Sequence, residues 1–208
     1  MAHASTDVLI DRIPVGRNVA TDAIWVVAFS LVTAALAQIS IHLRFVPVPI
    51  TGQTFGVLLS GALLGARRGF LSQVAYLGEG AAGLPVFADG ARSILHLVGP
   101  SGGFLLCFPL AAALVGYLVE LGMARSTWRL AGALISADMT ILFAGSMWLH
   151  LLFRVSVAQA WLWGFYPFLI ADSVKVVLVG CALPRALRRM DAWRDAPREA
   201  GDTEHPVI

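Results

Sequence analysis

Long apolar stretches, separated by short polar or glycine-rich connections, dominate this chain. Four stretches are close to the twenty or so residues that cross a bilayer core as a helix. They run from about Ala23 to Leu43, Ser101 to Glu120, Trp128 to Leu151 and Trp161 to Leu183. Each is too long for an ordinary buried strand, so the pattern predicts spanning helices.

Two shorter stretches lie between the first and second of these. They cover Thr54 to Ala66 and Phe70 to Gly83, and only Arg67-Arg68-Gly69 joins them. Short or glycine-interrupted spans occur where a helix is buried in protein or lines a cavity. Two tilted helices without a special role are the alternative. In total the chain is predicted to be an all-α integral membrane protein with six transmembrane helices, the second and third short.

The arginines predict the orientation, because loops on the cytoplasmic side of a membrane carry the excess of positive charge. With both termini cytoplasmic, only Arg44, Arg92 and Arg154 fall outside. The inner arginines are Arg12, Arg17, Arg67, Arg68, Arg125, Arg129 and the tail arginines from Arg185 to Arg198. The predicted division is a cytoplasmic segment 1–22, a membrane domain 23–188 and a polar cytoplasmic tail 189–208.

The composition supports a membrane protein, since 58% of the residues are hydrophobic and 13% are charged. A soluble domain carries about 25% charged residues. The net charge of +2 gives no reason to expect a nucleic acid partner. Cys107 and Cys181 lie in separate apolar stretches without metal-ligand spacing, so we expect free buried thiols.

The only lysine of the chain lies inside the last apolar stretch. Lys175 follows Asp172 by three residues, so both side chains project from one face of a helix. A charged residue at the centre of a spanning helix costs about 2.5–3.5 kcal/mol on insertion scales and is usually functional. The pair therefore predicts a pocket for a polar solute, with a structural ion pair between helices as the alternative.

Two outer connections could cover such a pocket. Arg44 to Gly52 contains Pro47 and Pro49, which favour an extended backbone. Leu84 to Pro100 is long for a connection in a compact membrane domain. The alternative is that both connections simply rest at the membrane surface.

Five short motifs follow one another along the chain. They are Val46-Pro-Val-Pro-Ile-Thr-Gly-Gln-Thr54, Leu63-Leu-Gly-Ala-Arg-Arg-Gly69, Tyr76-Leu-Gly-Glu-Gly-Ala-Ala-Gly-Leu-Pro-Val-Phe-Ala88, Gly99-Pro-Ser-Gly-Gly-Phe104 and Asp172-x-x-Lys175. In this order and spacing they resemble the BioY family, the substrate-binding (S) component of energy-coupling-factor biotin transporters. The resemblance covers about Ala23 to Arg188.

The resemblance implies capture of biotin from outside, at the cytoplasmic membrane of a prokaryote. Biotin would pass inward with a transmembrane (T) component and two cytoplasmic ATPases. The chain itself would be no enzyme and would bind no cofactor. It lacks the G-x-x-x-x-G-K-[ST] sequence with which a P-loop binds ATP.

The resemblance also implies which residues contact biotin. Asp172 and Lys175 match its last motif, and Arg92 is a looser match in the long outer connection. Tyr76 belongs to the third motif. A carboxylate can accept from the ureido N–H groups of biotin, and an ammonium can donate to its oxygens.

Further candidates follow from the apolar and polar parts of biotin. Gln53 and Thr51 are possible contacts at the pocket mouth or, alternatively, helix caps. Aromatic walls are expected in a small-molecule site. The candidates for these walls are Phe87, Phe104, Trp148, Trp163 and Tyr166, each of which could instead pack in the core or face lipid.

Two other functions stay open on the sequence. One is a stand-alone ion-coupled carrier that uses Asp172, Lys175 and Asp138, which we expect to face the bundle interior. The other is an intramembrane serine hydrolase with Ser101 as nucleophile and His150 as base, although Ser101 could simply cap a helix.

The first stretch carries small residues at four-residue spacing. These pairs are Ser30/Ala34 and Thr33/Ala37. Such spacing allows close helix approach, either to the T component or within the bundle.

Overall fold

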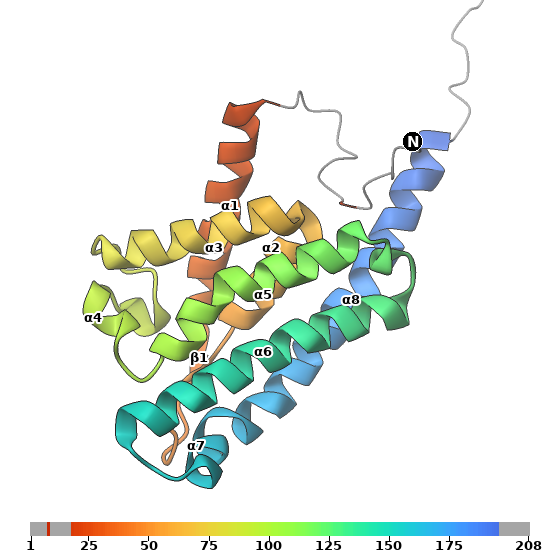
Figure 1. The fold of residues 1–208 in the computed structure, drawn as a ribbon. Coiled ribbons are helices and arrows are strands. Elements are labelled where there is room, and N and C mark those ends of the chain that lie inside the picture. The colour runs from red at the N-terminus through yellow and green to blue at the C-terminus, as the bar shows by residue number, and fades with distance from the viewer. Residues whose placement is uncertain (1–7, 9–17, 196–208) are drawn as a thin grey trace, which may run out of the picture.

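The protein is almost entirely helical in the computed structural model, which describes Val8 and residues 18–195 (Figure 1). The longer helices are α1 (Val19–Ala37), α2 (Gln53–Leu64), α3 (Ala66–Ala81), α5 (Gly102–Glu120), α6 (Thr127–Phe153) and α8 (Tyr166–Asp195). Shorter elements are α4 (Ile94–Leu97), α7 (Val157–Gly164) and the 3₁₀ turns η2 (Ala88–Gly90) and η3 (Met123–Arg125). The all-α prediction is confirmed.

Four helical segments within the described residues are long and apolar enough to cross a membrane. They are Val19–Ala37, Gly102–Glu120, Thr127–Phe153 and Val157–Cys181. Helix α2 is apolar but only 12 residues long. The chain is therefore a membrane protein with several apolar helices, and a count of six spans stays a prediction.

The end of the first helix was predicted wrongly. Helix α1 runs from Val19 to Ala37 instead of ending at Leu43. The following residues form a small antiparallel hairpin in which β1 (Ser40–Ile41) pairs with β2 (Ile50–Thr51). The apolar residues Ile39, Ile41 and Leu43 prolong the hydrophobic run, but they are exposed rather than helical.

The break between α2 and α3 also differs from the prediction. It falls at Gly65, whose φ of 84° lies in the region that favours glycine. The Glu120 carboxylate accepts a hydrogen bond of 2.8 Å from the Ala66 N–H and so satisfies a free donor at the start of α3. Arg67 and Arg68 are consequently part of the first turn of α3, not a linker.

The last predicted span is interrupted and longer than expected. Phe165 separates α7 from α8, and α8 continues to Asp195 rather than ending at Leu183. The predicted polar tail thus begins within α8, and its remainder lies outside the described residues. Most of the predicted segment 1–22 also lies outside them.

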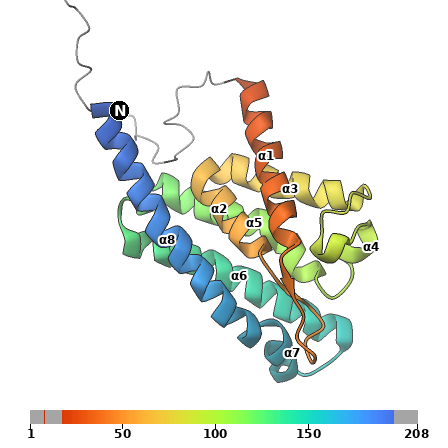
Figure 2. The same cartoon turned by 180° about the vertical axis from the view of Figure 1, so that it is seen from behind.

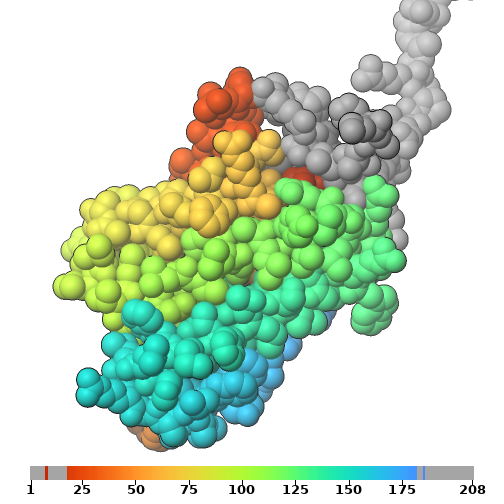
Figure 3. Space-filling model, viewed as in Figure 1, coloured from red at the N-terminus to blue at the C-terminus, as the bar shows by residue number. Residues whose placement is uncertain are grey.

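Helix α5 occupies the centre of the bundle and packs against α2, α3 and α6. Ala111, Ala112 and Val115 on α5 are fully buried. Helices α3, α5 and α6 lie side by side across one face of the molecule (Figure 3). The opposite face carries α1, α2 and α8 (Figure 2).

The connections gather at two ends of the bundle. One end carries the start of α1, the α2–α3 turn and η3, and there Arg68 Nε lies 2.7 Å from Asp22 Oδ1 (Figure 1). The other end carries the β1–β2 hairpin, the segment 84–100 and the α6–α7 turn. Among the described residues, Arg67, Arg68, Arg125 and Arg129 of the predicted inner group therefore lie at one end, and Arg44, Arg92 and Arg154 of the outer group at the other.

The small residues of α1 face the bundle. Ser30, Thr33, Ala34 and Ala37 are all buried, in a helix that packs against α2 and α3. The Ser30 hydroxyl donates to Glu79 Oε1 at 2.7 Å. These residues serve internal packing, so they do not form a free docking face.

Candidate functional site

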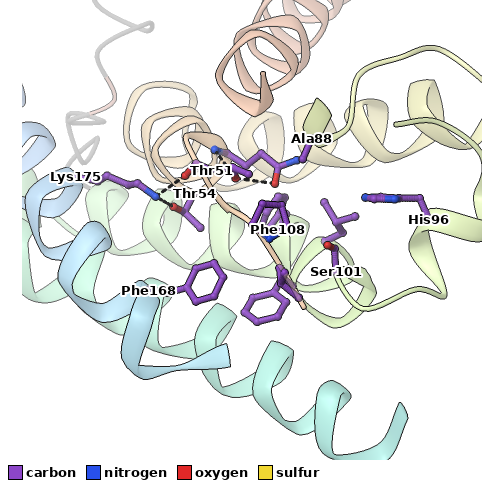
Figure 4. A pocket seen from close by; sticks show the side chains of 13 residues that line it. Thr51, Thr54, Ala88, His96, Ser101, Phe108, Phe168 and Lys175 are labelled. Carbon is purple, nitrogen blue, oxygen red and sulfur yellow. Dashed lines mark hydrogen bonds between the residues drawn. The ribbon is translucent and has the colours of Figure 1, made fainter. Parts of the chain in front are cut away.

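A small cavity lies at the end of the bundle that carries the hairpin, between α2, α5 and α8 (Figure 4). Its volume is about 20 Å³, which is room for about one water molecule. The polar lining residues are Thr51, Gln53, Thr54, His96, Ser101 and Lys175. The apolar wall includes Phe104, Phe108 and Phe168, while Val48, Pro49 and Ala88 come from the two outer connections.

Lys175 is fully engaged at this cavity. Its Nζ donates to the Thr51 carbonyl oxygen at 2.7 Å, to Thr54 Oγ1 at 2.6 Å and to Asp172 Oδ1 at 2.5 Å. An ammonium has three N–H donors, and these contacts use all of them. Lys175 therefore ties α8 to the hairpin and to the start of α2.

Asp172 is the buried partner of this lysine. Its side chain is fully buried, whereas that of Lys175 is 14% exposed. The Thr54 hydroxyl donates to the same oxygen, Oδ1, at 2.8 Å. The i,i+3 spacing of the pair thus produces the contact that the sequence predicted, and Thr54 completes it from a distant helix.

Gln53 and Tyr76 form a second polar connection beside the cavity. Gln53 Nε2 donates to the Tyr76 hydroxyl at 2.6 Å, and that hydroxyl donates to the Val86 carbonyl oxygen at 3.1 Å. The Thr51 hydroxyl donates to Gln53 Oε1 at 2.9 Å and accepts from the Gln53 N–H at 3.3 Å. Thr51 thus bonds to the start of α2 and also lines the cavity, while its contact with a substrate stays a prediction.

An aromatic stack supports the outer segment 84–100. The Phe87 ring packs edge-on against Tyr76 at 5.5 Å and stacks on His96 at 5.1 Å between ring centroids. A Cβ at Gly80 would lie 2.1 Å from the Phe87 ring, so glycine makes room for it. Phe87 is fully buried and packs on His96, which together with Ala88 lines part of the cavity.

The two outer connections are joined to each other as well as to the bundle. Gln38 at the end of α1 donates to the Phe87 carbonyl oxygen at 3.1 Å and accepts from the Gly90 N–H at 3.1 Å. The Ser40 hydroxyl donates to Asp89 Oδ1, and His42 Nε2 lies 3.0 Å from Asp89 Oδ2. The hairpin and the segment 84–100 therefore form one cover over the cavity.

The structure brings together four of the predicted site residues: Asp172, Lys175, Gln53 and Tyr76. Phe87 lies directly behind them. Trp148 is not one of the residues that line the cavity; its Nε1 donates to the Gly99 carbonyl oxygen at 2.8 Å, and its side chain packs over Gly103. Arg92 is exposed and is not one of the residues that line the cavity. Contact of any of them with a substrate stays a prediction.

Among the other aromatic candidates, only Phe104 lines the cavity. Its ring stacks on Phe168 at 5.4 Å between centroids. Trp163 packs on Phe153, and Tyr166 is largely exposed. Phe108 and Phe168 were missed, although a helical signal was present: Phe108 follows Phe104 by four residues, and Phe168 precedes Asp172 by four.

Ser101 and His150 do not line the same cavity and are not hydrogen-bonded to each other within the described residues. Ser101 lines the cavity and is the N-cap residue of α5, as predicted, although its side chain makes no capping hydrogen bond within the described residues. His150 Nδ1 lies 2.6 Å from the Val155 carbonyl oxygen, at the α6–α7 turn. His150 is thus engaged with the backbone at a separate place.

Comparison with known proteins gives a consistent result. The BioY family model matches residues 6–192. The probable biotin transporter BioY of Pyrococcus horikoshii is 39% identical over 150 residues, covering 72% of this chain and 86% of that protein. The biotin transporter BioY of Thermotoga maritima is 35% identical over 166 residues, covering 80% of this chain and 95% of that protein.

A solved structure shares the fold. It is the crystal structure of the S-component for biotin from an ECF-type ABC transporter, with a TM-score of 0.75 and 23% sequence identity. The match covers 81% of this chain and 92% of that one.

Proposed function

The chain belongs to the BioY family, and we propose that it captures biotin for uptake across the membrane as the S component of an energy-coupling-factor transporter. The observation that carries this proposal is the Lys175–Asp172 pair, placed by α8 at a covered cavity with an aromatic wall. Small-molecule sites combine an apolar wall with a few convergent polar groups.

Biotin recognition follows from the chemistry of these groups. Asp172 and Gln53 can accept hydrogen bonds from the ureido N–H groups, and Lys175 can donate to the ureido oxygen or the carboxylate. The rings of Phe104, Phe108 and Phe168 would take the thioether ring and the aliphatic chain. Biotin is the substrate in this proposal, and the chain uses no cofactor.

Admission of biotin requires the cover to move, because the cavity has room for about one water molecule. Lys175 holds the hairpin through the Thr51 carbonyl oxygen. If a biotin oxygen takes that N–H, the hairpin loses one of its ties to α8. Binding would thus be coupled to the position of the hairpin.

Arg92 does not line the cavity, so it could contact biotin only after such a movement of the cover. It lies on the segment 84–100 next to Ser93, whose N–H donates to the Gly80 carbonyl oxygen at 2.8 Å. We propose that Arg92 grips the biotin carboxylate once the cover has opened and closed around the substrate. An arginine can make two parallel hydrogen bonds to a carboxylate.

The proposed setting is the cytoplasmic membrane of a prokaryote. Six spans, with α2 and α3 short and both termini cytoplasmic, fit the separation of the arginines between the two ends of the bundle. Partners would be a T component and two cytoplasmic ATPases, which supply the ATP hydrolysis. The alternative is a stand-alone ion-coupled carrier. In that case the chain alone, reconstituted in vesicles, should take up biotin when an ion gradient is applied.

Membership of a transporter family makes the chain no enzyme. The separate engagements of Ser101 and His150 agree with this, since a serine nucleophile needs its base within hydrogen-bond reach.

The purified chain in detergent should bind biotin without ATP. Titration of intrinsic tryptophan fluorescence or calorimetry measures the affinity for biotin and for its methyl ester, with wild type and Arg92→Ala. We expect wild type to prefer free biotin and Arg92→Ala to lose most of that preference. Absence of biotin binding by the folded chain would contradict the function. An unchanged preference in Arg92→Ala would contradict only the role of Arg92.

Biotin binding should weaken in mild acid because of His96. Burial lowers the pKa of His96 below its usual value, and the nearby Asp89 carboxylate partly opposes this. The folded cover therefore favours the neutral form of the His96 ring over the protonated form. Its contribution to stability is complete above about pH 6.5, the ordinary value for histidine, and is lost as the pH falls below that.

We expect the affinity of wild type for biotin to fall about threefold or more between about pH 7.5 and 5.5. A carboxylate with an ordinary pKa near 4 stays ionised over this range, so such groups do not contribute to the change. His96→Phe keeps an aromatic ring on Phe87 and should flatten this pH dependence. The same acid loss in His96→Phe would show that another group is responsible.

A further inference from the structure

Asp138 is a buried acid in the middle of α6 that the proposed biotin contacts do not use. Its side chain is only 2% exposed, which confirms that it faces into the protein. It lines a groove of about 600 Å³ between α6 and α8, which is separate from the cavity. It is not among the residues that line the cavity itself.

Asp138 lies next to the carboxyl group of Asp172, close enough for a hydrogen bond between the two acids. A hydrogen bond between two carboxyl groups needs a proton on one of them, because ionised carboxylates only accept. Two buried oxygens, Asp138 Oδ1 and Asp172 Oδ2, lack a hydrogen-bond partner within the described residues when both acids are treated as ionised acceptors. A shared proton satisfies these two groups at once.

The charges near Asp138 lead to the same conclusion. Asp172 and Lys175, both on α8, are the charged groups that act on it. From α5 comes the thiol of Cys107, which donates to the Thr140 carbonyl oxygen, and Cys181 of α8 lines the groove. Helices α2 and α7 carry no titratable side chain. Arg125 belongs to η3, which precedes α6, so it is more than ten residues before Asp138 in the sequence.

Two ionised carboxylates and one ammonium would leave a net charge of −1 inside the bundle. The groove offers no cation to balance it, since Asp138 is the only charged residue among those that line it. Burying an unbalanced charge is costly, and neighbouring carboxylates respond by holding a proton between them. With one proton the group of Asp138, Asp172 and Lys175 is neutral.

We propose that Asp138 and Asp172 share one proton, and that Asp138 is thereby a positioning residue that holds Asp172 for biotin. The inference rests on the proposed function, because it concerns the same site. Asp138 donates the proton to Asp172 Oδ2 from behind, while Lys175 and Thr54 hold Oδ1 from the side of the cavity. Asp172 is then fixed as an ionised acceptor between donors on two sides.

Two variants separate this role from simple packing. Asp138→Asn keeps the shape and still offers an N–H donor to Asp172, but it cannot carry the shared proton. Asp138→Leu offers no donor. We expect Asp138→Asn to bind biotin within about threefold of wild type and Asp138→Leu to bind at least about tenfold more weakly, or about 1.4 kcal/mol.

Infrared spectroscopy of the purified protein without biotin tests the proton directly. A protonated carboxyl group has a C=O stretching band that a carboxylate lacks. We expect this band in wild type at neutral pH and its loss in Asp138→Asn. Glu79→Gln is the control, because Glu79 is the other acid with a buried, unpartnered oxygen among those described, and this variant should keep the band.

Persistence of the band in Asp138→Asn, or tight biotin binding by Asp138→Leu, would overturn the proposal. The infrared result does not depend on biotin. Failure of the shared proton can therefore be distinguished from failure of biotin binding by wild type, which concerns the function itself.

Discussion

Replacement of Lys175 by methionine should remove biotin binding and destabilise the protein. Methionine keeps much of the length of the side chain but loses the three N–H donors that hold Thr51, Thr54 and Asp172. We expect biotin affinity to fall at least tenfold, or about 1.4 kcal/mol. Removing one partner of a buried ion pair typically costs about 3–5 kcal/mol of stability.

Titration with biotin and thermal unfolding in detergent measure the two effects of Lys175→Met. Arg44→Met is the matched control, because Arg44 is an exposed cation near the hairpin. It should change neither quantity by much. Unchanged biotin binding in folded Lys175→Met would contradict the assignment of the site.

The double variant Asp172→Asn/Lys175→Met separates stability from recognition. It removes both charges, so no unpaired ion stays buried, and replacing a buried ion pair by uncharged groups is often neutral. Thermal stability should therefore recover toward wild type, while biotin binding stays lost. Recovery of binding in the double variant would mean that the ion pair is structural.

The Lys175–Asp172 contact could be predicted from the sequence because it is local. Spacing of three residues on a helix brings the two side chains together, and charges are rare enough in an apolar stretch to be noticed. The contacts of Lys175 with Thr51 and Thr54 could not be predicted. Helical periodicity shows which face of α8 is polar. It does not show which distant segment, here more than 120 residues away in the sequence, packs against that face.

The wrong helix ends have physical causes of the same kind. Hydrophobicity alone extended the first helix through Ile39, Ile41 and Leu43, although the Ser40–Thr51 pairing there forms a strand. Two neighbouring arginines suggested a linker at Arg67 and Arg68. Charge does not end a helix, however, and the chain turns one residue before α3, where Gly65 adopts a positive φ.

Residues chosen for their chemistry alone were the least predictable. Trp148 has a suitable ring for a biotin pocket, yet its N–H is used by the Gly99 carbonyl oxygen. Tertiary packing decides whether an aromatic residue faces a cavity, the core or lipid. Phe104 and Phe168 face the cavity, and Tyr166 does not.

Replacement of Gly61 by alanine should destabilise the bundle and weaken the biotin site together. A Cβ at Gly61 would lie 2.3 Å from the backbone oxygen of Ala112 on α5 and 3.0 Å from Val115 Cβ. Backbone atoms cannot turn aside as a flexible side chain can, so α2 has to move away from α5. Overpacking of this kind typically costs about 1–3 kcal/mol.

The effect of Gly61→Ala should reach the site because α2 begins with Gln53 and Thr54, which bond Tyr76 and Asp172. Gly132→Ala is the control: Gly132 lies inside α6, and apart from the neighbouring backbone of α6 itself no heavy atom of the described residues lies within 4 Å of its added Cβ. Alanine should stabilise that exposed helical position by up to about 1 kcal/mol, since glycine is the poorer helix former. In thermal unfolding, the stability should therefore fall in Gly61→Ala and rise in Gly132→Ala. In biotin titration, the affinity should fall only in Gly61→Ala. Equal stability of the two variants would show that α2 and α5 are not in the close contact from which the site is built.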